Sequence, residues 1–395
     1  MRKTASRPGP ARPGATRSSW GNNHQAPAGL ARVAERFRFP GRLVAVQPMG
    51  TGNVNDTYLV VFRTPFSEER GILQRINQRV FKKPEWILEN MRVVTKHVHR
   101  RLEREADAAD RIWQLPRLIP TKEGRSCHVD ENGEWWRSMT VIASAASYDR
   151  VQGPEHAMEV GGVLGQFHRL VSDLSPARLR DTLPGFHVTP RYLDTYDKML
   201  EKSAARKRLD SCAEAKRAAR FIGERRTLAG VLEGALRRGE LRLRTIHGDP
   251  KVNNVMIDDL TDKGTSIVDL DTVKPGLIHY DFGDALRSVC NPAGEETQNL
   301  GDVRFDTRLC EAFVRGYMPR AREFLAAADR KYLYDCVRLI AFELGLRFFQ
   351  DYLAGDVYFK VRYPGHNLQR ARVQFRLCES IEAREAAIRK VLNFG

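Results

Sequence analysis

The sequence predicts an α+β fold of two lobes, with a small strand-rich N-terminal lobe and a larger, mainly helical C-terminal lobe. Strand-like runs gather before about residue 147, long runs of helical periodicity follow residue 154, and one β-loop-β patch at 242–273 interrupts the helices. The chain has 395 residues, of which 42% are hydrophobic and 29% charged. It can therefore bury a sizeable core without disulfides, and a mostly disordered or collagen-like chain is excluded.

The first 30 residues are rich in Pro, Gly, Ala, Ser and Arg, and they carry five basic side chains and no acidic one. Such a segment buries too little apolar surface to order itself, so we expect residues 1–30 to form a disordered basic tail. The tail lacks the apolar region of a signal peptide, although it shares the Arg content and lack of acid of a transit peptide. The six cysteines form no C-x-x-C pair, and a cytoplasmic location is expected.

The formal net charge of +16 raises the question of a nucleic acid, membrane or phosphate partner. The tail supplies +5 of it, and the Arg-rich stretch at 202–238 has acidic residues interleaved, as in a solvated helix face. No apolar stretch approaches the roughly 18 residues of a membrane span. We therefore expect neither a nucleic acid nor a membrane partner, and a monomer.

The N-terminal lobe is expected to span residues 31–147. Short strands are expected at 43–46, 57–62, 71–76 and 134–143, and a helix is expected to begin at Pro84. Small residues at 143–147 predict a hinge near 141–147. The C-terminal lobe then spans 148–395, with helices expected at 155–171, 190–211, 212–238, 307–328 and 330–354.

The densest chemical signal lies in the patch at 242–273. A His-x-Asp run that ends at Asp249 is followed by Asn254, and the next apolar strand ends at Asp269. This is the spacing of a kinase catalytic loop and its metal-binding aspartate. Asp249 is the expected carboxylate that accepts or orients a hydroxyl proton. Asn254 and Asp269 offer the oxygen ligands that Mg²⁺ prefers, and they would hold it against nucleotide phosphates.

Three further residues near this motif are considered for roles. Lys251 is placed to neutralise charge on a transferring phosphoryl group. His247 is expected to support the loop through hydrogen bonds. Asp281 lies in a Tyr-Asp-Phe-Gly run, which contains the letters of the Asp-Phe-Gly motif of protein kinases. It lies past the strand-ending Asp269, so we expect this match of letters to be coincidental.

The N-terminal lobe offers candidate nucleotide contacts. Gly50 and Gly52, next to Asn53, flank a turn that would let backbone N–H groups approach phosphate. Nucleotide would then lie between the lobes, at the link that begins at Val141.

The third strand carries no lysine for the phosphates and reads Gln74-Arg75 instead. Strand alternation allows only one of the two to face the cleft, and Arg75 is preferred because it is a fixed cation. Its expected partner is a glutamate, and the sequence does not choose between Glu85 and Glu89.

The chain resembles the aminoglycoside phosphotransferase and choline kinase group, whose members share a two-lobed, protein-kinase-like fold. The resemblance covers about residues 43–378 and narrows to the N-acetylhexosamine 1-kinases. The runs that carry the narrower match lie at 50–58, 72–77 with 80–81, 269–276 with 280–284, and 348–368.

This resemblance implies Mg²⁺-dependent phosphoryl transfer from ATP to the anomeric hydroxyl of a free N-acetylhexosamine, such as N-acetylglucosamine or N-acetylgalactosamine. It implies Asp249 as the base and Asn254 and Asp269 as metal ligands. It also implies that Arg347 and Tyr358 hold the hexose. A tyrosine offers a ring face and a hydroxyl to a sugar, and an arginine offers forked donors.

Two other functions stay open. The same fold could phosphorylate an aminoglycoside, a choline-like amino alcohol or another small hydroxyl compound, but the basic and aromatic run at 358–363 favours a neutral sugar. A non-catalytic binding protein that uses the basic tail is the second alternative. The intact set of Asp249, Asn254 and Asp269 argues against it. The sequence does not separate ATP from other nucleoside triphosphates, nor one N-acetylhexosamine from another.

Overall fold

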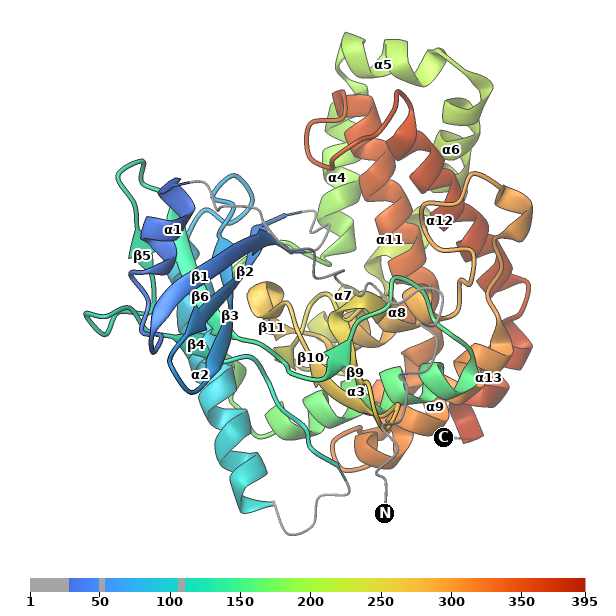
Figure 1. The fold of residues 1–395 in the computed structure, drawn as a ribbon. Coiled ribbons are helices and arrows are strands. Elements are labelled where there is room, and N and C mark those ends of the chain that lie inside the picture. Colours follow the sequence, from blue (N-terminus) through green and yellow to red (C-terminus); the bar gives the residue numbers. More distant parts are fainter. Residues whose placement is uncertain (1–27, 50–53, 106–110, 395) are drawn as a thin grey trace, which may run out of the picture.

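The computed structural model describes residues 28–49, 54–105 and 111–394 and has the predicted α+β, kinase-like architecture. An antiparallel sheet occupies one side of the molecule and a mainly helical part the other (Figure 1). Gly50, Gly52 and Asn53 lie outside the described residues, as do most of the expected tail and the last residue. The predicted domain boundaries stay a prediction.

The N-terminal sheet has the strand order β1-β2-β3-β6-β4, and β5 also pairs with β6. The face of the sheet that α1 covers buries Val46, Val60, Phe62, Leu73 and Trp136 in one cluster with residues of that helix, because alternate side chains of a strand point to the same face. Helix α1 packs along β1. The elements are α1 (Ala28–Ala34), β1 (Arg42–Pro48), β2 (Asp56–Arg63), β3 (Glu68–Arg75), β4 (Leu118–Ile119), β5 (His128–Val129) and β6 (Trp135–Thr140).

Helix α2 (Pro84–Arg104) begins with the proline that the sequence indicated, at a position where the missing N–H costs nothing. Its apolar stripe, which includes Ile87, Met91 and Val94, is buried. The chain leaves β6 and forms β7 (Ala145–Ala146), which pairs with β9 of the helical part. The predicted link near 141–147 therefore connects the sheet to the helical part through a strand pair.

The helical part is organised around α11, which is buried along most of its length. Its elements are α3 (Pro154–Val171), η2 (Pro176–Arg178), α4 (Thr189–Leu200), α5 (Ser203–Asp210), α6 (Ala213–Glu224), η3 (Arg226–Gly230), α7 (Val231–Arg237), α8 (Ile278–Val289), η6 (Leu300–Asp302), α9 (Thr307–Ala321), α10 (Ala327–Lys331), α11 (Leu333–Ala354), α12 (His366–Glu382) and α13 (Glu385–Phe394).

Three expected helices are broken in the structure, and the run at 307–328 splits into α9 and the start of α10. The run at 190–211 splits into α4 and α5 because Lys202 adopts an extended backbone, with ψ 130°. The run at 212–238 splits at Arg225 into α6, η3 and α7. The shorter pieces pack separately, since α4, α5 and α7 contact α11 whereas α6 contacts α12 as well.

The β-loop-β patch lies next to the sheet side of the molecule and forms two small strand pairs. Strand β8 (Arg244–Ile246) pairs with β11 (Lys274–Gly276), and β9 (Val255–Asp258) pairs with β10 (Gly264–Ile267). The short turns η4 (Val252–Asn254) and η5 (Leu270–Thr272) follow β8 and β10. This arrangement brings the ends of β8 and β10, and the polar motifs behind them, to one place.

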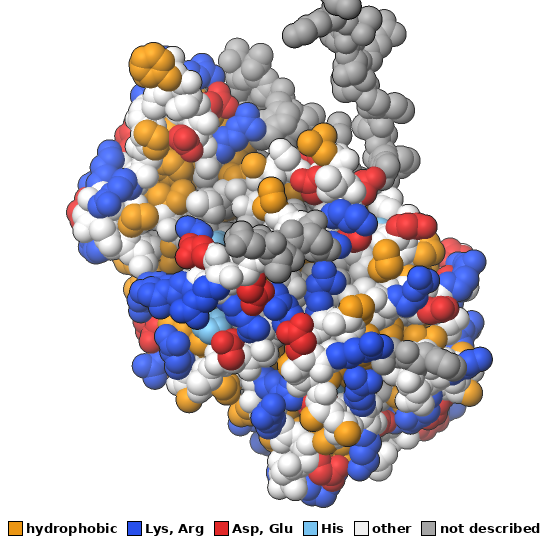
Figure 2. Space-filling model, turned by 90° about the horizontal axis from the view of Figure 1, so that it is seen from below, with side chains coloured by type: hydrophobic (Ala, Val, Ile, Leu, Met, Phe, Trp, Pro, Cys, Tyr) orange, Lys and Arg blue, Asp and Glu red, His pale blue; other side chains and the backbone are white. Residues whose placement is uncertain are grey.

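The charged side chains on the face drawn in Figure 2 are dispersed. Figure 2 shows Lys and Arg side chains spread over the face seen from below, with Asp and Glu side chains among them. No helix within the described ranges combines the length and apolar character needed to cross a bilayer.

Candidate active site

The loop that carries Asp249 turns sharply after β8. Gly248 has a φ of +89°, and a Cβ built on it would lie 2.6 Å from the carbonyl oxygen of Thr272. A residue other than glycine would therefore be strained here and would collide with backbone. The hydroxyl of Thr272 donates to the carbonyl oxygen of His247 at 2.8 Å, which fixes the same turn from the other side.

Asp281 supports this loop through buried hydrogen bonds, a role that the sequence analysis did not assign to it. Its carboxylate accepts the backbone N–H groups of His247 and Gly248, both at 2.7 Å, and bonds His168 Nε2 at 2.9 Å. The residue lies in the first turn of α8 and is fully buried. Burial opposes its ionisation, but the His168 hydrogen bond and these amides hold the pKa of Asp281 below its usual value.

The Asp249 side chain is partly buried, with 26% of it exposed. Lys251 Nζ donates to its Oδ2 at 2.8 Å, and Asn254 Nδ2 donates to its backbone oxygen at 2.7 Å. Burial opposes the charge, but the ammonium of Lys251 outweighs it and lowers the pKa of Asp249. The carboxylate is therefore ionised at neutral pH and available to accept a proton or hydrogen bond.

His247 occupies the supporting position expected from the sequence. Its ring is buried, and Nε2 lies 2.9 Å from the carbonyl oxygen of Val268. The backbone N–H of Asp249 approaches Nδ1 at 3.3 Å. These contacts join the loop to the segment that leads into Asp269.

Asp269 adopts a left-handed backbone with φ 64° at the start of η5. Its exposed carboxylate makes no hydrogen bond or ion pair with any residue in the described ranges. Although the side chain is exposed, desolvation by the surrounding protein and the neighbouring carboxylates of Asp271 and Asp249 raise the pKa of Asp269 to about 7. A site that disfavours a further negative charge in this way is suited to a cation.

The residues present fit Mg²⁺ with nucleotide phosphates rather than a metal held by protein alone. No group of three or more His, Cys, Asp or Glu side chains within the described ranges could hold a metal ion. Asn254 and Asp269 supply an amide oxygen and an unpartnered carboxylate, and Mg²⁺ commonly takes one or two protein ligands together with phosphates and waters.

The expectation that Arg75 of the third strand faces the site was wrong. Gln74 faces the site, since its amide oxygen accepts from Arg137 Nε at 3.0 Å and its Nε2 donates to Thr57 at 2.9 Å. Arg75 points to the opposite face of the sheet, where its Nε donates to Asp56 at 3.0 Å and Glu134 lies at 3.7 Å. Neither expected glutamate pairs with it, because Asp56 stands directly opposite on β2.

The cation on the site face is Arg137 of β6, which sequence reasoning missed. It is 1% exposed and forms an ion pair with Asp271, itself 2% exposed. Asn55 Nδ2 donates to the same carboxylate at 2.6 Å. The signal in the sequence was a charged residue within the apolar run 135–142. Asp271 thus joins the sheet to the segment that carries Asp269.

Arg347 of α11 lies close enough to Tyr358 and to Asp249 for their charges to interact, and the sugar-binding role of Arg347 and Tyr358 stays a prediction. The guanidinium carbon of Arg347 lies 4.9 Å from the ring centroid of Phe186, 5.4 Å from Tyr192 and 5.6 Å from Phe359. Arg347 makes no hydrogen bond or ion pair with a residue in the described part of the chain. Its charge acts on Tyr358, and Asp249 acts on it. Its donors are therefore oriented by aromatic rings and available to a ligand.

The backbone around Tyr358 is fixed by Asp351. Its carboxylate accepts the N–H groups of Val357, Tyr358 and Phe359 at 2.9, 2.8 and 2.9 Å. Asn367 Nδ2 donates to the same carboxylate at 2.9 Å. The Tyr358 side chain is nevertheless 53% exposed, so the loop presents an ordered backbone and an accessible ring.

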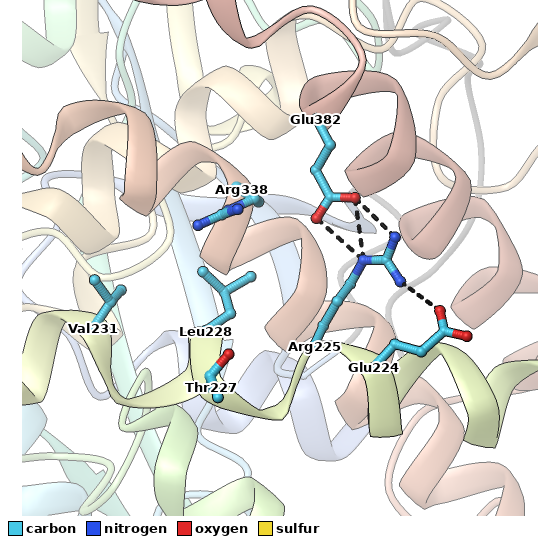
Figure 3. Close-up of a pocket in the computed structure, with 7 residues that line it drawn as sticks. All are labelled: Glu224, Arg225, Thr227, Leu228, Val231, Arg338 and Glu382. Atoms are coloured by element: carbon cyan, nitrogen blue, oxygen red, sulfur yellow. Dashed lines mark hydrogen bonds and ion pairs between the residues drawn. The ribbon is translucent and has the colours of Figure 1, made fainter.

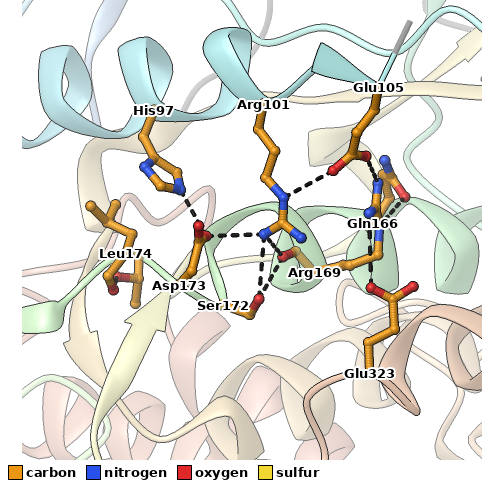
Figure 4. A network of polar contacts seen from close by, with 10 residues as sticks. His97, Arg101, Glu105, Gln166, Arg169, Ser172, Asp173, Leu174 and Glu323 are labelled. Atoms are coloured by element: carbon orange, nitrogen blue, oxygen red, sulfur yellow. Dashed lines mark hydrogen bonds and ion pairs between the residues drawn. The ribbon is translucent and has the colours of Figure 1, made fainter. Parts of the chain in front are cut away.

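Val141 lies between β6 and β7, on the segment that joins the sheet to the helical part. Elsewhere, ion pairs join α2 to α3. Figure 4 shows His97 and Arg101 of α2, and Glu105 directly after it, facing Asp173 and Arg169, with His97 and Arg101 bonding Asp173 at 2.9 and 3.0 Å. These contacts attach the helix of the sheet side to the helical part.

A cavity of about 400 Å³ lies away from these residues, between η3, α11 and α12 (Figure 3). Arg225 and Glu382 form an ion pair at 2.8 Å in its wall, and Arg338 lies above Leu228. It contains none of the residues singled out from the sequence, and its charged groups largely pair with each other.

Comparisons with known proteins identify the family and the fold of the chain. A model of the phosphotransferase enzyme family matches residues 48–327. An aminoglycoside phosphotransferase from Alicyclobacillus acidocaldarius is 14% identical, with a TM-score of 0.56 over 96% of this chain and 99% of that one.

Two further solved structures share the fold. A microcompartment-associated aminopropanol kinase is 18% identical, with a TM-score of 0.54 over 91% of this chain and 98% of that one. A choline kinase from Cryptosporidium parvum is 14% identical, with a TM-score of 0.53 over 88% and 91% of the two chains. At these identities the likeness shows the fold, and it leaves the acceptor undecided.

Proposed function

Because the chain belongs to the phosphotransferase enzyme family, we propose that it transfers the γ-phosphoryl group of ATP to the anomeric hydroxyl of a free N-acetylhexosamine. The ionised Asp249 carboxylate supports the proposal, since it is placed to orient the attacking hydroxyl and receive its proton. Asn254 and Asp269 would hold Mg²⁺, which when bound neutralises charge on the phosphates. Lys251 would add a second positive charge beside the transferring group.

The observation that carries the choice of acceptor is the cationic Arg347 in its aromatic surroundings. A cationic amino alcohol or aminoglycoside would be repelled by this charge unless carboxylates offset it. The two carboxylates of α11 that lie one helical turn from Arg347 are already committed: Glu343 bonds His187, and Asp351 bonds three backbone N–H groups. A neutral sugar with an acyl oxygen is instead complementary to a guanidinium and to exposed aromatic faces.

The alternative acceptor is a choline-like amino alcohol, an aminoglycoside or another small hydroxyl compound. An aminopropanol kinase and a choline kinase share this fold, and their names are the reason to consider this class of acceptor. A cationic acceptor would need carboxylates or aromatic faces, and the aromatic faces here already surround the guanidinium of Arg347.

The first experiment measures ADP release from Mg²⁺-ATP with N-acetylglucosamine, N-acetylgalactosamine, glucose, galactose, kanamycin and choline, and applies phosphorus NMR to any product. Turnover of an N-acetylhexosamine with an anomeric phosphate signal is expected. Turnover of kanamycin or choline alone would overturn the sugar assignment and keep the phosphotransferase. Asp249→Asn, expected to lower kcat by about 10²–10⁴-fold while staying folded, is the inactive control.

A second variant tests the acceptor wall. Tyr358→Ala is expected to raise the KM of the sugar by about tenfold and to leave the KM of ATP nearly unchanged, because the exposed ring would contact the acceptor and not the nucleotide. Phe66→Ala, which removes an exposed ring between β2 and β3, is the control. A rise confined to the ATP KM would place Tyr358 outside the acceptor site.

A further inference from the structure

A buried histidine–glutamate pair lies beside the Asp249 loop and has no part in the roles above. His187 is 3% exposed and Glu343 of α11 is 1% exposed. His187 Nδ1 lies 2.9 Å from Glu343 Oε1, and Nε2 lies 2.8 Å from the carbonyl oxygen of Gly248. Gly248 immediately precedes Asp249, so the imidazole reaches the peptide group that carries the proposed base.

The two partners of His187 dictate its protonation. A backbone carbonyl only accepts hydrogen bonds, and an ionised carboxylate also only accepts, so both ring nitrogens must donate. The second oxygen of Glu343 accepts the hydroxyl of Thr189 at 2.7 Å, so an ionised Glu343 has a hydrogen-bond donor at each of its two oxygens. Burial opposes charge on both groups, but their mutual attraction raises the pKa of His187 and lowers that of Glu343.

The surroundings of His187 favour the same state. Asp284 of α8 adds a further attraction to the imidazole, and the Tyr280 ring stacks on it with centroids 5.3 Å apart. The ammonium of Lys274, the neighbouring cation, is held by Asp181 at 3.0 Å and by backbone oxygens.

Both polar groups of the Gly248 backbone are thereby fixed from opposite directions. Asp281 of α8 accepts the Gly248 N–H at 2.7 Å, and His187 donates to the Gly248 carbonyl oxygen at 2.8 Å. His187 itself has a left-handed φ of 65°, a conformation that a histidine rarely adopts and that must be held by its contacts. Losing either contact frees the peptide that sets the direction of the Asp249 side chain.

We propose that His187, held as an imidazolium by Glu343, is a positioning residue that fixes the Gly248–Asp249 peptide and so orients the Asp249 carboxylate. This role rests on the proposed function, in which Asp249 engages the acceptor hydroxyl. Arg347 lies one helical turn after Glu343, so α11 would hold both the acceptor arginine and the anchor of the imidazolium.

The first test is independent of any acceptor. In ¹⁵N-histidine-labelled protein, the His187 signals, identified by their absence in His187→Gln, are expected at imidazolium positions for both nitrogens between about pH 6 and pH 8. In Glu343→Gln, the new amide can donate to Nδ1, and a neutral ring protonated on Nε2 is expected. A neutral His187 in the unsubstituted protein would overturn the proposal.

The second test is kinetic and uses N-acetylglucosamine, or transfer to water if that sugar is not phosphorylated. His187→Ala is expected to lower kcat by about 100-fold with little change in the KM of ATP, as for a misplaced catalytic group. Glu343→Gln keeps the bond to Gly248 and is expected to retain most of the kcat that His187→Ala loses.

A control histidine separates positioning from stability. His279 of α8 is 1% exposed and its Nε2 lies 2.9 Å from the carbonyl oxygen of Asp329, outside the loop. His279→Ala is expected to lower the melting temperature comparably and to keep kcat. Equal kcat losses in the two alanine variants would overturn the positioning role. If no sugar is phosphorylated but the His187 nitrogen signals are those of an imidazolium, only the proposed function is contradicted.

Discussion

The contact between Asp281 and the Asp249 loop gives the sharpest prediction for stability. Asp281→Asn keeps the size of the side chain but replaces one acceptor oxygen with an N–H₂ donor. The three groups that surround the carboxylate are the amides of His247 and Gly248, at 2.7 Å each, and His168 Nε2 at 2.9 Å. The asparagine must therefore leave at least one buried donor unsatisfied.

The cost follows from the burial of Asp281, which is fully enclosed. Breaking a buried charged interaction by removing one partner costs about 3–5 kcal/mol, so the free energy of unfolding should fall by that amount at pH 7. Urea unfolding followed by tryptophan fluorescence measures it. Asp197→Asn is the matched control, because Asp197 pairs with Arg226 at the surface and its loss should cost less than about 1 kcal/mol.

The pH dependence supplies a second check. The pKa of Asp281 is lowered in the folded protein, so its contribution is present above the unfolded pKa of about 3.9 and disappears as the pH falls through the lower folded value. The stability difference between the two proteins should therefore shrink below about pH 4. A difference under about 1 kcal/mol at pH 7, or one independent of acid, would refute the reasoning.

Three further predictions concern the site. Asp271→Asn leaves the buried Arg137 without its anionic partner and should lower the free energy of unfolding by about 3–5 kcal/mol, measured in urea; a loss below about 1 kcal/mol would contradict the pairing. Arg75→Met should leave the KM of ATP within about twofold, since Arg75 makes a surface ion pair on the opposite face; a tenfold rise would restore its phosphate role. Asp269→Asn should raise the Mg²⁺ concentration for half-maximal activity by about tenfold or more, and an unchanged Mg²⁺ titration would remove Asp269 from the metal site.

Elements with strong local periodicity could be predicted from the sequence. The stripe of Ile87, Met91 and Val94 and the proline that precedes it identified α2, because these residues lie within a few turns of each other. The helix boundaries in the Arg-rich stretch could not be found in this way. Lys202 and Arg225 are ordinary helix formers, and the breaks there let successive short helices pack separately.

The orientation of β3 illustrates what a single strand leaves open. Alternation correctly predicted that Gln74 and Arg75 lie on opposite faces, but the choice between the faces depends on the neighbouring strands. Asp56 on β2 attracts Arg75 outward, and Arg137 on β6 draws Gln74 toward the site. Both neighbours are distant in the sequence, so charge alone suggested the wrong side.

The sequence by itself determined which residues share the central loop, since His247, Asp249, Lys251 and Asn254 are fixed relative to each other by a few peptide bonds. Only the tertiary structure decided what holds that loop. Its supports come from α8, from α11 and from the segment before α4, and they reach the loop only when these elements pack together. Burial then makes each supporting charge costly unless it is paired, and this is why distant acids and histidines are found together around one turn.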